Sequence, residues 1–488
     1  MAAIGTTRRK FLKTIGLGGA ALLHRGRTGL AGQISGRAAD DESTHSVREE
    51  ARDIPVAHEC DICVVGGSCT GVFAAIRAAR LGAKVAIVER QNCFGGTATN
   101  SLVNVWHSLM DTEFKRQIIA GLTQELMQRM KKRGAVKETG RSRSAGFAFN
   151  SSEMKIELDE MIREAKVKPF LHTFFCAPYV RDGRLEAVVV QNKSGRSAIK
   201  AAMFIDATGD ADLCSRLGLA TYVRDQLQPP TTCATFSGLN LPAGKLHQLL
   251  REHREEFKLP EGFVWGRGVP GSDVYMLAGT RVYGVNCADA EQLTRAEIEG
   301  RRQVRAIMDI LRKYAPDNRI ALQALPSQIG IRETRHVRCR YQLSGDDVLH
   351  GKRFADAIAN GSYRVDIHHQ DKPGITFKYL DGTQVYSRPG HTSASSRWRE
   401  KTSTNPTFYQ IPYRSLVPPR CRNLIVAGRM LDADIEAFSA VRVMVNMNQT
   451  GEAAGTACYL ALDAGVRIVD VDTQKLRRTL ARGGSIII

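Results

Sequence analysis

The chain has 488 residues, 43% of them hydrophobic, and a formal net charge of +19 at pH 7. This length suits one large composite unit or two to three domains with a substantial core. No run reaches the roughly 18 apolar residues of a membrane span, and no basic stripe is interleaved with aromatic residues, so we expect neither a transmembrane segment nor a nucleic-acid partner.

Residues 1–31 have the features of an export signal. They contain six basic and no acidic residues, and residues 7–13 read TRRKFLK, the twin-arginine pattern. A short, glycine-containing apolar stretch follows at 14–23. We expect export through the twin-arginine translocation machinery to the periplasm or another extracytoplasmic compartment, with the segment cleaved or kept as an anchor. Residues 32–59 are polar and mixed in charge, and are predicted to be a linker.

Residues 61–100 contain the pattern of a dinucleotide-binding unit. A strand predicted at 62–65 leads into the turn GGSCTG at 66–71; a helix is predicted over 72–81 and a second strand over 84–88. The turn brings backbone N–H groups and a helix N-terminus to a pyrophosphate. Glu89 follows Gly71 by 18 residues, the distance at which an acidic residue accepts hydrogen bonds from ribose hydroxyls. Ser68 stands where the usual fingerprint has its second glycine.

A second glycine pair, Gly95-Gly96, follows the second strand. A nicotinamide domain does not need this loop, but it fits a loop that passes beneath the pyrophosphate and the ring of a flavin. Helices are predicted over 114–133 and 153–165, and extended chain over 168–180. Turns at 181–183 and 193–195 then predict a β-meander with strands at 185–191 and 198–205.

The later part of the chain divides into two regions that differ in composition and in their predicted elements. Residues 221–405 are rich in aromatic residues and histidines, include a long charged helix predicted over 290–314, and are expected to form a mixed α+β substrate domain. Strands are predicted at 409–417 and 423–429. A helix predicted over 439–464 has small residues for close packing on a sheet, and its N-terminus directs a positive dipole end at a ligand.

Eleven cysteines are scattered along the chain. The number is odd and the spacing is not that of a disulfide framework. Cys60 and Cys63 form a C-x-x-C pair, but Cys63 falls inside the first predicted strand and no second pair accompanies it. We therefore expect no metal site.

Four motifs occur in an order that is typical of one family. They are GGSCTG at 66–71, FGGTAT at 94–99, FIDATGDADL at 204–213, and NLIVAGR at 423–429 with RVM and GEAAGTA after it. On these motifs, residues 60–465 resemble the bacterial FAD-dependent oxidoreductases of the glutathione-reductase-like superfamily. The resemblance implies an α/β fold with FAD as cofactor. A Rossmann-like FAD-binding domain with an inserted β-meander would be built from 60–220 and 406–466, with a substrate domain at 221–405 and a tail at 467–488.

The family pattern assigns cofactor contacts to matching positions of this chain. The pyrophosphate would be wrapped by the first turn, the ribose held by Glu89 and its neighbour, and the ring approached by the second loop and by the start of the last helix. The residues implied are Gly66, Gly67, Ser68, Thr70, Gly71, Glu89, Arg90, Gly95, Gly96, Thr97, Thr208, Gly209, Asp210, Gly428, Arg429, Arg442 and Val443. Arg442 and the helix N-terminus would stabilise the negative charge of reduced flavin.

The reaction is expected to need a base beside the flavin, because dehydrogenation next to oxygen or nitrogen releases a proton as well as a hydride. His107, His368 and His391 are the candidate bases, with Arg332 and Tyr413 as positioners of an anionic or polar small-molecule substrate. The leading expectation is an exported dehydrogenase or oxidase. A flavin-binding electron-transfer subunit and a flavin monooxygenase stay open as alternatives.

Overall fold

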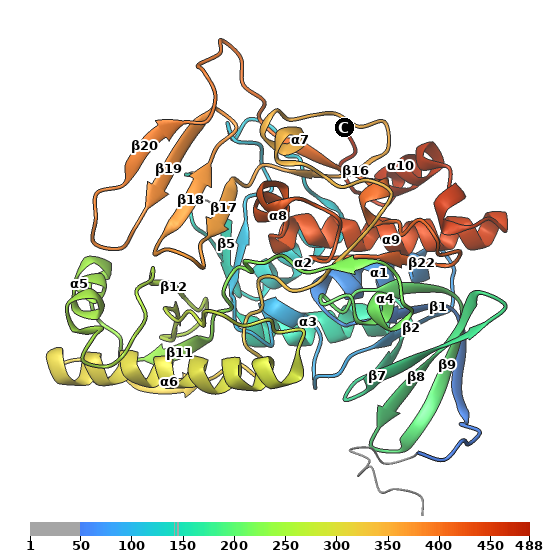
Figure 1. Ribbon diagram of the computed structural model, residues 1–488, viewed down its shortest axis with the longest axis horizontal. Helices are drawn as coiled ribbons and strands as arrows, with labels where there is room; N and C mark the ends of the chain where they lie inside the picture. Colours follow the sequence, from blue (N-terminus) through green and yellow to red (C-terminus); the bar gives the residue numbers. More distant parts are fainter. Residues whose placement is uncertain (1–48, 141, 144–145) are drawn as a thin grey trace, which may run out of the picture. The chain divides into compact units, whose positions relative to one another are not determined.

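The centre of the fold is a seven-stranded sheet in which five strands run parallel (Figure 1). The computed structural model describes residues 49–140, 142–143 and 146–488. The strand order is β6-β2-β1-β9-β8-β7, and β22 also pairs with β9. The bounds are β1 Val56–Val65, β2 Val85–Val88, β6 Lys168–Phe170, β7 Phe174–Arg181, β8 Arg184–Asn192, β9 Gly195–Asp206 and β22 Leu424–Val426.

Strand β1 is the centre of this sheet because its apolar run, Ile62 to Val65, is buried on both faces. The strand begins at Val56, six residues before the predicted start. The predicted meander is confirmed as the antiparallel strands β7, β8 and β9. One edge of β9 pairs with β8 along its first half and with β22 at its end, so the chain returns to the parallel sheet after more than 200 residues.

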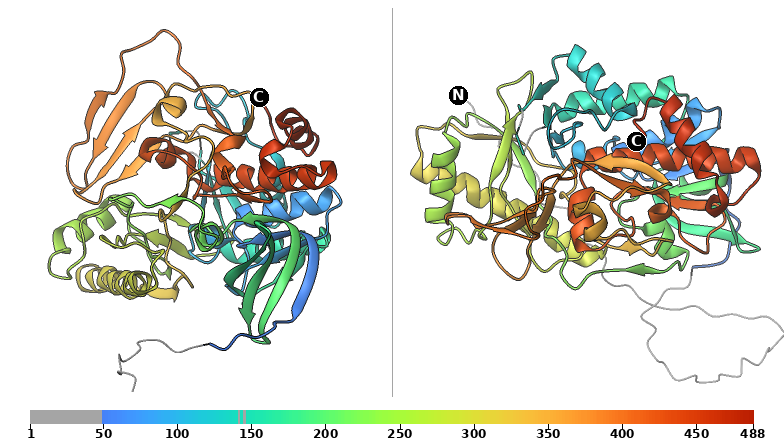
Figure 2. Two further views of the ribbon diagram at one scale, coloured as in Figure 1. Left: turned by 45° about the vertical axis from the view of Figure 1, so that its right-hand side comes forward. Right: turned by 90° about the horizontal axis from the view of Figure 1, so that it is seen from above.

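Two helices from opposite ends of the chain pack on each other over this sheet (Figures 1 and 2). They are α1 (Cys69–Arg80) and α9 (Met444–Ala464). A side chain on Gly451 or Gly455 of α9 would come within 2.0 or 2.1 Å of the carbonyl oxygens of Thr70 and Ala74 of α1. The small residues were predicted to pack on a sheet, but these two glycines allow the backbones of the two helices to touch.

The predicted helix over 439–464 is wrong as one element. It is two helices, α8 (Ile435–Val441) and α9, because Val443 is extended, with ψ 144°. The helix predicted over 114–133 is also shorter: α2 is Gly121–Lys132. Phe114 and Gly121 have positive φ, and the carboxylate of Asp111 accepts the N–H of Lys115 at 3.0 Å, which forms a turn in place of the first helical turns.

Two predicted strands also divide. The stretch 168–180 supplies β6 to the parallel sheet and β7 to the meander, and the stretch 409–417 is strand β21 followed by a 3-10 turn. The other predicted helices match closely, with α3 at Ser151–Glu164 and α6 at Ala290–Tyr314.

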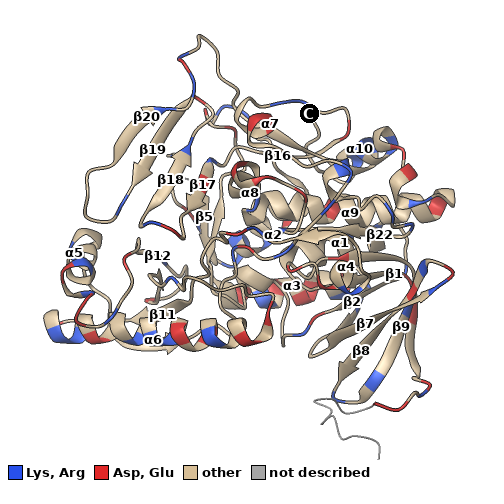
Figure 3. Ribbon diagram, in the orientation of Figure 1, with Lys and Arg blue, Asp and Glu red and all other residues tan. Residues whose placement is uncertain are grey.

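Two four-stranded antiparallel sheets lie outside the parallel sheet. One contains β12 (Trp265–Gly268), β13 (Tyr275–Ala278), β11 (Cys233–Ser237) and β14 (Ala321–Ala324); another contains β17 (Val365–His368), β18 (Ile375–Lys378), β19 (Thr383–Ser387) and β20 (Ala394–Arg397). The first has its own core with α5 (Ala243–His253) and α6. Acidic and basic residues of α6 form ion pairs along its exposed face (Figure 3).

Shorter elements complete the fold. The strands are β3 (Val105–His107), β5 (Gly146–Phe149) and β4 (Val136–Glu138) in one sheet, β10 (Thr221–Tyr222) with β15 (His336–Val337), and β16 (Ala357–Gly361) with β21 (Tyr409–Pro412). The helices are α4 (Asp212–Arg216), α7 (Gly345–Leu349) and α10 (Thr473–Arg482), with 3-10 turns at Gly96–Ala98, Tyr413–Leu416 and Ile468–Asp470.

Residues 54–488 form one compact unit, and the twin-arginine pattern lies outside the described residues. Within the described ranges, no helix is long and apolar enough to cross a membrane. Residues 337–365 contribute to the core of the parallel sheet, whereas residues 234–320 form the separate core around α6. The boundaries of the two domains stay a prediction.

Candidate functional site

The first glycine turn lies where three parallel strands end. Val65, Asp206 and Val426 are the last residues of β1, β9 and β22 and lie in register. Gly66 has φ 108°, and a side chain there would come within 2.3 Å of the carbonyl oxygen of Ala207. Only glycine fits such a position. The turn therefore lies at the carboxyl edge of the sheet, where open α/β sheets bind their ligands.

The side chains of Ser68 and Glu89 accept hydrogen bonds from backbone N–H groups of the first glycine turn. Ser68 is the N-cap of α1, and its hydroxyl accepts the N–H of Gly71 at 3.4 Å. The buried carboxylate of Glu89 accepts the backbone N–H of Gly67 at 2.7 Å and that of Gln91 at 2.8 Å. Burial raises the pKa of Glu89, and these two donors oppose the shift. The serine in place of glycine thus acts as a helix cap.

The second glycine loop packs directly on the first. The N–H of Gly95 donates to the carbonyl oxygen of Gly67 at 2.8 Å. A side chain on Gly96 would lie 2.8 Å from the Cβ of Ser68. A narrow cavity of about 50 Å³ opens between the loops. The predicted cofactor residues that line it are Gly66, Gly67, Ser68, Glu89, Arg90, Gly96, Thr97 and Thr208.

Arg429, which follows β22, forms an ion pair with Asp210, which follows β9. Its guanidinium donates to the carboxylate of Asp210 at 2.6 Å, and Thr334 donates to the same oxygen at 2.8 Å. Gly209 has φ 83°, a conformation that favours glycine, and a side chain there would also come within 2.4 Å of the guanidinium of Arg429. Asp210 is therefore a buried partner of Arg429, and it lines neither the narrow cavity nor the larger one beside it.

The larger cavity, which we call the inner cavity, has a volume of about 380 Å³. Thr97 and Ile331 line both cavities, so the two adjoin. Its walls combine apolar and aromatic residues of β3, β11, β12 and β18 with a concentration of guanidinium groups. The six arginines that line it are Arg267, Arg281, Arg332, Arg364, Arg429 and Arg442.

The break between α8 and α9 opens onto the inner cavity. Arg442, Val443 and Met444 all line it. Val443 is the N-cap of the 21-residue helix α9, and no side chain of the described residues caps that N-terminus. Its first N–H groups and the positive end of its dipole therefore face the inner cavity. The helix predicted over 439–464 thus ends where expected but begins at Met444, and Arg442 and Val443, which the resemblance placed at a helix start, line the inner cavity.

Two side chains of β17 form an acid–histidine pair in the inner cavity. Asp366 and His368 are two residues apart on a strand and share a face. The Nε2 of His368 lies 3.2 Å from a carboxylate oxygen of Asp366. The other carboxylate oxygen accepts the hydroxyl of Tyr363 at 2.7 Å and lies 3.5 Å from the guanidinium of Arg442.

The pair is asymmetric in charge. Burial lowers the pKa of His368 to about 3, against the opposing effect of Asp366, so the imidazole is neutral at pH 7. Burial alone would raise the pKa of Asp366, but His368 and the surrounding guanidiniums hold it well below its usual range. The site therefore presents an ionised carboxylate beside a neutral base.

The other catalytic candidates lie on the walls of the same cavity. Arg332 donates to the hydroxyl of Thr231 at 2.6 Å and to the carbonyl oxygen of Pro229. The ring of His107 packs against Tyr363, with ring centroids 4.0 Å apart and ring planes tilted by 36°. Burial, and then the charge of a neighbouring arginine, lowers the pKa of His107 to about 3, so it too is neutral at pH 7.

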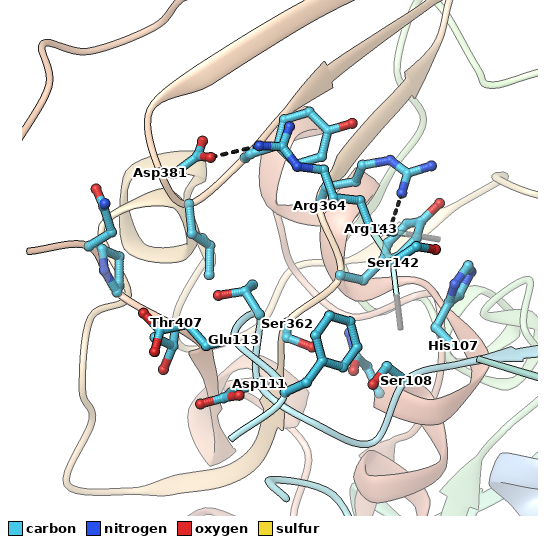
Figure 4. Close-up of a pocket in the computed structure, with 18 of the residues that line it drawn as sticks. His107, Ser108, Asp111, Glu113, Ser142, Arg143, Ser362, Arg364, Asp381 and Thr407 are labelled. Atoms are coloured by element: carbon cyan, nitrogen blue, oxygen red, sulfur yellow. Dashed lines mark hydrogen bonds and ion pairs between the residues drawn. The ribbon is translucent and has the colours of Figure 1, made fainter. Parts of the chain in front are cut away.

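His107, Tyr363 and Arg364 also line a second pocket of about 260 Å³, the outer cavity (Figure 4). Arg364 donates to the carbonyl oxygen of Arg143 at 2.6 Å, and Arg143 pairs with Asp381 at 2.8 Å. Because His107, Tyr363 and Arg364 line both cavities, they form the partition between the inner and the outer cavity.

Two positions singled out by sequence lie elsewhere. Tyr413 is buried, and its hydroxyl donates to the carbonyl oxygen of Ile468 at 2.6 Å, so it is a core residue. His391 lies on an exposed turn after β19 and lines a different pocket. Asp366 was missed, although the alternation Asp366-Ile367-His368 in a strand-like stretch was the signal that could have found it.

The donor set fits a dinucleotide with a ring at one end. The glycine loops leave a narrow polar cradle, and the inner cavity is larger and partly apolar. Two cavity arginines predicted to contact the cofactor, Arg429 and Arg442, have a buried Nε with no hydrogen-bond partner within the described part of the chain. Buried donors of this kind need a partner, and an anionic ligand supplies one.

A parallel sheet with two glycine loops and a returning C-terminal strand and helix defines a dinucleotide-binding flavoprotein. The family model described as FAD dependent oxidoreductase matches residues 61–480, and the chain belongs to that family. It is an FAD-dependent oxidoreductase, and FAD is its cofactor.

Two curated relatives match parts of the chain. Mitochondrial dihydrolipoyl dehydrogenase of Schizosaccharomyces pombe is 33% identical over 110 residues, which is 20% of this chain and 21% of the relative. The soluble pyridine nucleotide transhydrogenase of Chromohalobacter salexigens is 28% identical over 155 residues, 31% of each protein. The chain thus matches under a third of the length of either relative.

Among solved structures, a geranylgeranyl bacteriochlorophyll reductase-like protein from Thermoplasma acidophilum overlaps with a TM-score of 0.44 at 10% identity, over 88% of this chain and 84% of the other. The p-nitrophenol 4-monooxygenase of Pseudomonas putida overlaps with a TM-score of 0.42 at 9% identity, over 87% and 85%.

Proposed function

We propose that this protein oxidises a small organic substrate by hydride transfer to FAD, with His368 as the base, in an extracytoplasmic compartment. The observation that carries the proposal is the pairing of neutral His368 with ionised Asp366 in the wall of the inner cavity. The neutral imidazole has a lone pair that can take a proton, and the Asp366 carboxylate opposes the effect of burial on its pKa by stabilising the imidazolium that results.

Different residues of the chain are assigned to cofactor binding and to proton transfer. The two glycine loops, Arg429 and the N-terminus of α9 would hold the cofactor, and bound FAD would supply the acceptor for a hydride from the substrate's C–H bond. His368 would take the proton of the neighbouring O–H or N–H group. The carboxylate of Asp366 near Nε2 favours the tautomer protonated there, which leaves Nδ1 as the proton acceptor. Nδ1 has no hydrogen-bond partner among the described residues.

Anaerobic reduction of the purified holoprotein tests the reaction. Alcohols, amines and hydroxy acids are mixed with it, and the loss of flavin absorbance is recorded. We expect one class to bleach the flavin, and His368→Asn to slow the bleaching at least about 100-fold. His391→Asn, on an exposed turn, is the control and should leave the rate unchanged. A holoprotein that no metabolite bleaches, yet that exchanges electrons with a partner protein, would instead be the electron-transfer subunit.

Export is tested separately by the arginine pair at positions 8 and 9. Replacing both with lysine keeps the charge but removes the twin-arginine pattern. We expect the folded, flavin-loaded protein to accumulate in the cytoplasm when both are changed, and in the extracytoplasmic fraction when Lys13→Arg is made as the control. Equal export of the two variants would contradict the assignment.

A further inference from the structure

Four arginines of the inner cavity have no acidic partner. Within the described ranges of the chain, no carboxylate lies at ion-pair distance from the guanidinium of Arg267, Arg281, Arg332 or Arg364. Each donates instead to a main-chain carbonyl oxygen, those of Gly266, Phe263, Pro229 and Arg143 respectively. A carbonyl oxygen orients a guanidinium but leaves its charge uncompensated.

Elsewhere the chain pairs its enclosed arginines with carboxylates. Arg77 pairs with Glu452, and Arg224 with Glu333, and all four side chains are at most 14% exposed. The absence of such partners is therefore a property of the cavity and not of the whole protein.

The charge of the cavity is strongly unbalanced. Asp366 is the single acidic residue of its lining, and it already lies within 3.5 Å of Arg442. Arg429 is paired with Asp210. The other four guanidiniums thus create a positive potential in a partly enclosed space, where charges are screened less than in water.

We infer that the substrate is a small organic acid, held through carboxylate groups by Arg332, Arg364 and their neighbours. This inference rests on the proposed function. The flat fork of a guanidinium matches a carboxylate with two parallel hydrogen bonds. Phe263, Trp265 and Phe377 line the same cavity and offer apolar surface to the carbon body of the acid. An anion also relieves the cost of burying Arg281, which is 7% exposed.

One of these arginines, Arg364, is shared by the inner and the outer cavity. Figure 4 shows its guanidinium at the upper wall of the outer one, joined to Arg143. An acid that enters through the outer cavity meets this charge before it meets Arg332 or the Asp366–His368 pair.

Binding to the oxidised holoprotein tests the inference without turnover. Succinate and benzoate are compared with succinamide and benzamide, which keep the shape but lose the charge, by calorimetry and by shifts of the flavin spectrum. Inorganic phosphate is the non-organic anion. We expect the acids to bind at least about tenfold more tightly than the amides, and more tightly than phosphate. Equal or tighter binding of the amides or of phosphate, or no binding of either acid, would overturn the inference.

Two variants locate the anion. Arg332→Gln is expected to weaken acid binding about 10- to 100-fold, the range for loss of a hydrogen bond to a charged group, and to change amide binding less than about threefold. Arg332→Lys should fall between, because it keeps the charge but not the fork. Arg305→Gln, on the exposed face of α6, is the control and should change neither. Equal loss of acid and amide binding in Arg332→Gln would overturn the assignment of this residue.

The result separates the two proposals. Tight acid binding without flavin bleaching by any acid supports the carboxylate site and contradicts hydride transfer. Bleaching by a neutral alcohol, with acids bound no better than amides, supports hydride transfer and contradicts the carboxylate site.

Discussion

Replacing Glu452 with glutamine tests whether one buried ion pair holds together two helices, α1, which begins at the first glycine turn, and α9, which begins at the inner cavity. Glu452 in α9 pairs with Arg77 in α1, and the side chains are 1% and 6% exposed. The same carboxyl group accepts the N–H of Leu122 at 3.0 Å and the hydroxyl of Ser485 at 3.3 Å. It therefore joins four separate segments of the chain.

The expected cost follows from what glutamine can still do. Its amide oxygen can accept one or two of these hydrogen bonds, but the charge of Arg77 is left buried without a counter-ion. Breaking a buried pair from one side costs about 3–5 kcal/mol. Since Leu122 can keep its acceptor, we expect a loss of about 3 kcal/mol in the free energy of unfolding. Such a loss is large because the whole free energy of unfolding of a native protein is about 5–15 kcal/mol.

Urea unfolding of the holoprotein, followed by tryptophan and flavin fluorescence, measures this loss. Glu125→Gln is the matched control. Glu125 pairs with Arg80, which lies in α1 as Arg77 does, but this pair is at the surface, with side chains 30% and 35% exposed. An exposed pair contributes at most about 1 kcal/mol. We expect Glu452→Gln to release flavin at a clearly lower urea concentration than the control does. If both variants lose less than about 1 kcal/mol, the pair does not hold α1 and α9 together.

Three further changes have defined outcomes. Gly455→Ala places a methyl group 2.1 Å from the carbonyl oxygen of Ala74 and should lower the free energy of unfolding by about 1–3 kcal/mol, measured by urea titration; an unchanged value would contradict the close helix contact. Gly66→Ala meets Ala207 at 2.3 Å with φ at 108°, so the purified protein should carry less flavin per chain by absorbance, and a full flavin load would refute this. Burial lowers the pKa of His368 to about 3, so between pH 6.5 and 3 the unfolded chain takes up a proton that the folded chain does not. Stability should therefore fall with decreasing pH by up to about 1.4 kcal/mol per unit for this group, and His368→Asn should flatten the slope measured from pH 7.5 to 5. Equal slopes would show that His368 is not buried in its neutral form.

The glycine turn beside the narrow cavity could be predicted from sequence because its parts are local. The turn at Gly66 needs its glycine for a positive φ and a close strand contact, and both leave a mark in the sequence next to an apolar strand. The return of β22 to the sheet could be predicted for the same reason, as a short apolar run that ends at Gly428.

The inner cavity could not be predicted in the same way. Arg267, Arg332, Arg364 and Asp366 come from three separate stretches, and nothing in the pattern around each says that they meet. Arginine and histidine are also common at exposed positions, so composition does not separate a cavity arginine from a surface one. Asp366 with His368 is the exception, since alternation along a strand puts them on one face.

The helix break at Val443 was missed because helix propensity continues through it, yet it connects binding with chemistry. In an uninterrupted helix, the N–H groups after Val443 would bond to carbonyl oxygens of the preceding turn. The extended backbone at Val443 frees them at the cavity and starts a long helix there without a side-chain cap from the described residues. Arg442, the last residue before the break, lies beside Asp366, which in turn lies beside His368. One backbone discontinuity thus directs a helix dipole at the inner cavity and places beside Asp366 a charge that keeps its carboxylate ionised. On the proposed function, the same residues serve both the anionic ligand and the base.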